Sequence, residues 1–112
     1  MSAQSLKRYG RIIGLKPEAY DEYVKYHAAV WPEVLKTIHD CHICNYTIFY
    51  RDHLLFAYFE YTGDDFDADM AKMAADPKTQ EWWAIMKPMQ VPLEGRREGE
   101  WWLELEEVFH TD

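Results

Sequence analysis

The chain is poor in cysteine and in positive charge, and it has no long apolar run. Among its 112 residues there are two Cys, 12 Lys or Arg and 20 Asp or Glu, with a net charge of −8. An acidic surface repels phosphate backbones and anionic membranes, and no run approaches the about 20 apolar residues that cross a bilayer. Residues 1–7 are polar and lack a signal core. We therefore expect a cytoplasmic protein with reduced thiols, no nucleic-acid partner and no membrane partner.

The usual signatures of cofactor chemistry are also missing. No glycine-rich phosphate loop, G-x-S-x-G elbow or paired-carboxylate motif occurs, which argues against phosphoryl and hydride transfer. The one cluster with metal-ligating side chains is His39, Cys41, His42 and Cys44. It lacks the second, separated ligand pair of a structural zinc site, and its C-x-x-C precedes a strand, whereas redox motifs open a helix. We expect no metal and no cofactor.

What the chain has in abundance is aromatic side chains, at 16% of residues. Its length and 48% apolar content suit a single domain, residues 1–112, with residues 1–6 as a flexible tail. So many aromatic rings suggest a ligand site or an interface, although a small core could also use them.

Periodicity predicts the order strand, helix pair, strand, strand, helix pair, strand. Residues 9–15, 43–50, 54–61 and 101–109 have strand character, with 51–53 closing a hairpin. Helical spacing follows Pro17, and Pro32 should kink or restart that helix. Asp64 or Asp65 should cap the next helix, and Asp76-Pro77 should begin another.

This order is that of an α+β, ferredoxin-like fold, a four-stranded antiparallel sheet with helices on one face. The other face of such a sheet is left open. Small domains cover an open face with a ligand or with a second copy of themselves, and we expect a homodimer that buries it.

Three rings share one side of the first helix, because Tyr23, His27 and Trp31 are four residues apart. The imidazole can transfer protons near neutral pH, the phenol can bind hydroxyls and the indole can stack on the C–H face of a sugar. Spacing alone fits an ordinary core stripe as well.

Two tryptophan pairs add to the candidate site. Adjacent helical residues point about 100° apart, so one core face does not readily bury both Trp82 and Trp83. One should pack while the other lines a cavity or contacts a partner subunit. In the expected last strand, Trp101 and Trp102 should point to opposite faces, one into the core and one toward a partner or pocket rim.

At these residues the chain resembles the L-rhamnose mutarotase family. The resemblance rests on 23-YVKYH-27, 30-VWPE-33, 45-NYTI-48, Trp82-Trp83 and 107-EVFH-110, in the order and spacing of the family. It implies a dimeric α+β barrel, a monosaccharide substrate and no cofactor. The histidine at the position of His27 is the family's proton donor. Tyr23, Tyr46, Trp82 and Trp83 match its sugar-binding residues.

The chain departs from the family where rhamnose-handling members carry Asn-Pro-Asp-Asn-Ser-Pro. Residues 91–98 instead read VPLEGRRE. The implied activity is interconversion of the α and β anomers of a 6-deoxy sugar, L-rhamnose first and L-fucose as the alternative. A non-catalytic sugar-binding module or a cofactor-free monooxygenase would share the fold.

Overall fold

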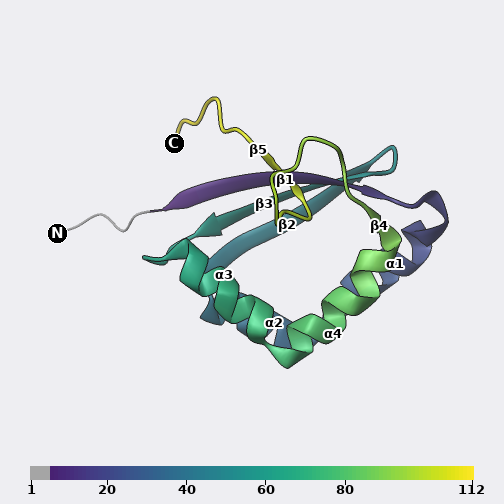
Figure 1. Ribbon diagram of the computed structural model, residues 1–112, viewed down its shortest axis with the longest axis horizontal. Helices are drawn as coiled ribbons and strands as arrows, with labels where there is room; N and C mark the ends of the chain where they lie inside the picture. The colour runs from purple at the N-terminus through teal and green to yellow at the C-terminus, as the bar shows by residue number, and fades with distance from the viewer. Residues whose placement is uncertain (1–5) are drawn as a thin grey trace.

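The computed structural model describes residues 6–112 and shows one antiparallel sheet with four helices gathered along one side (Figure 1). The strands are β1 Lys7–Leu15, β2 Ile43–Arg51, β3 Leu54–Tyr61, β4 Gln90–Val91 and β5 Leu103–Leu105. The helices are α1 Tyr20–His27, α2 Pro32–Asp40, α3 Phe66–Ala75 and α4 Pro77–Met86, with single 3-10 turns at Pro17–Ala19 and Lys87–Met89. Apart from Leu6, the expected tail lies outside the described residues. No helix within 6–112 has the length and apolarity to cross a membrane.

The fourth position of the sheet is shared by two short strands. The strand order is β2-β3-β1-β4, and β5 also pairs with β1. Val91 stands opposite Gly14 and Leu103 opposite Ile12, where a strand continuing from Val91 would place Leu93. β4 and β5 therefore occupy the same strand position beside β1, with ten extra residues between them. The expected α+β, ferredoxin-like fold is confirmed, but the expected last strand over 101–109 is wrong. Within that stretch only Leu103–Leu105 pairs with β1, and β4 makes the remaining pairs along this edge of β1.

The core lies between the sheet and the helices. On β1 and β3 every second residue faces the helices, and the buried members include Ile13, Leu15 and Leu55. Val34, Trp82 and Met86 cover them from α2 and α4. A smaller cluster of Ile43, Phe59 and Tyr61 packs under α3.

The helices begin at the proline and aspartate residues that the sequence predicted. Pro32 begins a new helix after a short break at residues 28–31, so the first helical stretch is restarted rather than kinked. Asp65 caps α3 by accepting from the Ala68 N–H, and Asp76 caps α4 by accepting from the Thr79 N–H. These side chains satisfy backbone donors that no helical carbonyl reaches.

Strand β2 carries a bulge that the sequence pattern did not predict. Asn45 and Tyr46 together oppose Phe59, and Asn45 has a φ of 51°. An extra residue moves the following side chains to the other face, which turns Ile48 and Tyr50 toward the helices. The predicted hairpin then closes with Asp52 and His53, both in the left-handed region, as in a two-residue type I′ turn.

Candidate functional site

The helical spacing brings Tyr23, His27 and Trp31 to one cluster around Trp82. The rings of Tyr23 and His27 stack with centroids 4.2 Å apart, and His27 meets the edge of Trp82 at 5.4 Å. Trp31 meets the same indole at 5.2 Å. Tyr23 and Trp82 are buried, whereas His27 and Trp31 are half-buried. The three rings therefore belong partly to the core, and the imidazole of His27 remains partly exposed at the surface.

The tautomer of His27 follows from its hydrogen bond. Its Nδ1 lies 2.8 Å from the carbonyl oxygen of Tyr23. A carbonyl only accepts, so Nδ1 carries the proton and Nε2 of the neutral ring is left as a proton acceptor. Burial lowers the pKa of His27, and the bond to the carbonyl offsets this in part. Near neutral pH the resting side chain is an uncharged base.

Tyr46 lies in the bulge of β2, on the helix-facing side of the sheet. The bulge in β2 places its ring against the helix-facing Phe59, with centroids 5.6 Å apart. Desolvation raises the pKa of the Tyr46 phenol, although 43% of the residue is exposed. Burial also raises the pKa of Tyr23, and the charge that Tyr46 would carry raises it further. Both phenols hold their protons at neutral pH and can donate them.

The two tryptophans of α4 differ in burial, and Trp82 is the one that packs. Trp82 is 6% exposed and fills the centre of the cluster, while Trp83 is half-buried at its edge. Lys87 Nζ sits 5.5 Å from the Trp83 ring centroid and 5.4 Å from that of Trp101. A cation over two indole faces holds them together.

Gln90 belongs to the site and was missed in the sequence. Its side chain is buried, its Nε2 donates to the Tyr23 hydroxyl at 3.3 Å, and its Oε1 accepts from Trp101 Nε1 at 2.7 Å. A lone glutamine in a two-residue strand carries no periodic signal, so sequence reasoning had nothing with which to find it.

The prediction for Trp101 and Trp102 is wrong. Both indoles pack against the main core cluster, on the helix side of the sheet. The rule of alternating faces applies to extended strands, and these residues precede β5 in a bend.

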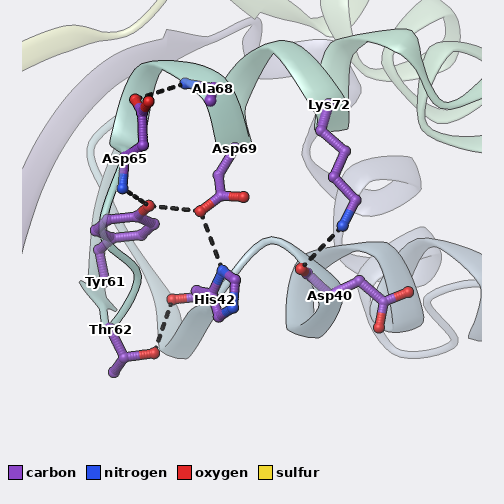
Figure 2. A network of polar contacts seen from close by, with 8 residues as sticks. All are labelled: Asp40, His42, Tyr61, Thr62, Asp65, Ala68, Asp69 and Lys72. Carbon is purple, nitrogen blue, oxygen red and sulfur yellow. Dashed lines mark hydrogen bonds and ion pairs between the residues drawn. The ribbon is translucent and has the colours of Figure 1, made fainter.

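The segment with His39, Cys41, His42 and Cys44 runs from the end of α2 into β2. Within residues 6–112 no three His, Cys, Asp or Glu side chains are placed to hold a metal ion, and both thiols are free. His42 instead joins a polar network under α3, drawn in Figure 2. Its Nδ1 lies 3.0 Å from Asp69 Oδ2, which also accepts from the buried Tyr61 hydroxyl. These bonds tie α3 to the ends of β2 and β3.

Asp69→Asn should reduce stability at neutral pH and change little in acid. The hydrogen bonds from Tyr61 and then His42 lower the pKa of Asp69 below its ordinary value of 3.8. A carboxyl with a depressed folded pKa contributes stability that is present above its unfolded pKa and is lost as pH falls through the folded one. Urea unfolding near neutral pH and near about pH 3 measures the difference.

Asp67→Asn is the matched control, since Asp67 is exposed on the same helix and outside this network. An Asp69→Asn protein whose midpoint shift is equally large at both pH values would contradict the linkage.

Comparison with known proteins places the chain in one family. A sequence profile described as L-rhamnose mutarotase matches residues 8–111. The L-rhamnose mutarotase of Oceanobacillus iheyensis is 35% identical and aligns over 96% of this chain and 100% of its own. That of Phocaeicola vulgatus is 36% identical with the same coverage.

Two further relatives bear on substrate and on fold. A protein of Xanthomonas campestris pv. campestris named L-fucose mutarotase is 32% identical over 94% of this chain and 88% of its own. A crystal structure of an L-rhamnose mutarotase from Formosa agariphila superposes with a TM-score of 0.74. It covers 95% of this chain and 99% of that one at 23% identity, a likeness that concerns the fold.

Proposed function

The chain belongs to the L-rhamnose mutarotase family, and from this premise we propose that it interconverts the α and β anomers of L-rhamnose with His27 as its proton-transfer residue. An anomer-interconverting isomerase is the function that the full-length relationship supports. The observation that carries the assignment to His27 is the neutral imidazole stacked on Tyr23, with Nε2 left as an acceptor.

Mutarotation needs one proton removed and one supplied. The proton of the anomeric hydroxyl leaves as the C1–O5 bond breaks and O5 takes up a proton, which gives the open aldehyde. Rotation about C1–C2 presents the other face of the carbonyl, and ring closure returns both protons. Nothing is oxidised or reduced, and the sugar and the enzyme end with the protons they began with.

In the opening direction the neutral His27 accepts the anomeric proton at Nε2, and a phenol donates to O5. The raised pKa values of Tyr23 and Tyr46 keep both phenols protonated for this purpose. On ring closure His27 returns its proton as the acid, which is the role that the family resemblance assigns to it. Trp82 holds the imidazole ring edge-on, and Trp83 offers an indole to the C–H and methyl side of a 6-deoxy sugar.

L-fucose is the second candidate substrate, supported by the named relative from Xanthomonas and by the departure of residues 91–98 from the rhamnose pattern. NMR exchange spectroscopy on the anomers of L-rhamnose, L-fucose and D-glucose tests both. We expect wild-type protein to accelerate exchange of L-rhamnose most. Acceleration of L-fucose alone would transfer the assignment to that sugar. Saturable binding with spontaneous exchange would indicate a non-catalytic binding module.

We also propose that two copies pair through the open face of the sheet. An apolar row crosses that face from strand to strand, because Phe49 pairs with Phe56, Phe56 with Ile12 and Ile12 with Leu103. Phe49 is 63% exposed and Phe56 36% exposed. A continuous apolar surface of this kind is typical of an interface, and the helices all lie on the other side (Figure 1).

Phe49→Glu should convert the dimer to a monomer. The carboxylate would lie at the β2 end of the apolar row, where pairing would strip it of water without supplying a partner. Sedimentation velocity over a range of concentrations reads the mass. Val24→Glu makes the same change at an exposed position of α1 and should leave the dimer intact. A wild-type protein that sediments as a monomer would refute the pairing.

The cytoplasm is the proposed location. Two free cysteines, one of them buried, fit a reducing compartment.

A further inference from the structure

We propose that Gln90 and Trp101 are positioning residues that orient the Tyr23 hydroxyl with its proton toward the substrate, and that the loop of residues 92–102 thereby positions the acid of the ring-opening step. The inference rests on the proposed function, because it assigns roles within that same site. It concerns residues outside the family motifs described above.

The direction of the hydrogen-bond chain is fixed at its outer end. An indole Nε1–H can only donate, and Trp101 donates to Gln90 Oε1 at 2.7 Å. The Gln90 amide is therefore oriented with its nitrogen toward Tyr23, to whose hydroxyl oxygen it donates at 3.3 Å. Since Tyr23 accepts from Gln90, its own proton must point elsewhere.

Burial makes a reversal of this chain costly. Gln90 is 7% exposed and Tyr23 4% exposed, so few waters reach either side chain. If the amide turned over, its NH₂ group would face the indole N–H and its carbonyl would face the phenol, leaving buried donors opposed. Every buried side-chain N or O atom in the described part of the chain has a partner as the structure stands.

The inserted loop holds Trp101 in place by its own bonds. Arg96 spans it, with Nε donating to the Leu93 carbonyl at 2.8 Å and a terminal nitrogen donating to the Glu100 carbonyl at 3.0 Å. Glu100 in turn accepts from the Arg97 N–H at 2.9 Å. Lys87 lies over the Trp101 ring from the end of α4. The bonds within residues 93–100 and the contact with Lys87 together hold the indole where its Nε1–H donates to Gln90.

As a consequence, a hydrogen-bond donor and a hydrogen-bond acceptor lie side by side, the Tyr23 hydroxyl as the acid and His27 Nε2 as the base. His27 presents a lone pair at Nε2, and the neighbouring Tyr23 presents a hydroxyl proton. Ring opening needs one group of each kind at the two oxygens of the anomeric carbon. Without the hydrogen bonds from Trp101 to Gln90 and from Gln90 to Tyr23, the Tyr23 hydroxyl could turn its proton toward Gln90. Its oxygen would then face the sugar as an acceptor.

Gln90→Glu tests the polarity directly. A carboxylate still accepts a hydrogen bond from Trp101, but it also accepts one from the Tyr23 hydroxyl, whose proton then points toward residue 90 and away from the substrate. We expect kcat for anomer exchange to fall by about tenfold or more, up to the about 10²–10⁴-fold contribution of an acid–base group, with little change in KM. Activity should recover partly as the pH falls and the introduced carboxylate becomes protonated, an ionisation that the wild-type profile lacks.

Trp101→Phe removes the donor that orients Gln90 while keeping a ring, and we expect a smaller fall in kcat than for Gln90→Glu. Trp102→Phe is the matched control, because its indole comes from the same loop and packs on the core without a hydrogen bond to Gln90. If Gln90→Glu and Trp101→Phe matched Trp102→Phe in kcat and pH profile, the inference would be overturned.

A second readout separates this inference from the proposed function. The Trp101 indole proton gives its own ¹H–¹⁵N NMR signal, and Gln90→Met should shift it and speed its exchange with solvent. An unchanged signal would overturn the chain whatever the activity. Spontaneous anomer exchange by the wild-type protein, with the signal responding as expected, would overturn the proposed function and leave the bonding of Tyr23 supported.

Discussion

Replacing His27 with alanine should lower the catalysed rate of anomer exchange by about 10²–10⁴-fold, the usual contribution of a positioned acid–base group. The reason is the loss of the lone pair at Nε2, which the bond from Nδ1 to the Tyr23 carbonyl leaves free. NMR exchange spectroscopy with the sugar that the wild-type protein accelerates most would measure it.

His27→Asn is the sharper variant, since its amide can still donate to the Tyr23 carbonyl but cannot transfer a proton. It should be as inactive as His27→Ala while staying closer to wild type in stability. Full exchange rates in either variant would remove His27 from the mechanism.

The pH profile of the wild-type protein provides an independent control. Because desolvation lowers the pKa of His27 below its ordinary 6.5, the side chain stays neutral at pH values where a solvent-exposed histidine is already charged. The catalysed rate should be level near neutral pH and decline only on the acid side of 6.5. A decline that begins above that value would contradict the neutral-base assignment.

Trp82→Ala should cost about 3–5 kcal/mol of unfolding free energy, a large part of the total for a small domain. Its indole is buried and meets the edges of Tyr26, His27 and Trp31, so truncation leaves a cavity at the centre of the helix layer. Urea unfolding measures the loss, and Trp82→Phe should recover much of it.

Trp83→Ala should affect sugar binding more than stability, the reverse of the effect expected for Trp82→Ala. This indole is half-buried at the edge of the cluster, so its removal should weaken sugar binding, seen as a raised KM, with a smaller loss of stability. Equal losses of stability in the two alanine variants would contradict the division of the pair into a packing residue and a binding residue.

Helical periodicity explains why several side chains of the candidate site could be predicted to lie together. Tyr23, His27 and Trp31 were placed on one side of a helical stretch by spacing alone, and the structure gathers them around Trp82 even though a break at residues 28–31 separates α1 from α2. The break preserves the stripe because α2 restarts beside α4. A short apolar run predicted β1, alternation predicted β2, and the short connection at residues 51–53 predicted β3 as its hairpin partner.

Features decided by tertiary contacts escaped prediction. The bulge that turns Tyr46 toward Phe59 needs a left-handed Asn45, and asparagine adopts that conformation in many other settings. Strand β4 is two residues long, too short for any period, so Gln90 had no context. Trp101 and Trp102 looked like strand residues because their neighbours alternate, yet Gln90 and the core hold them in a bend.

The divided fourth strand makes this fold a natural acceptor for grafted segments. Val91 and Leu103 lie in one line beside β1, opposite Gly14 and Ile12, so whatever joins them leaves the sheet and returns to the same register. Residues 92–102 can therefore be exchanged for shorter or longer stretches without re-pairing a strand. Variation at this single junction offers evolution, and equally a designer building libraries, a way to change the side chains beside the candidate site while the rest of the sheet stays the same.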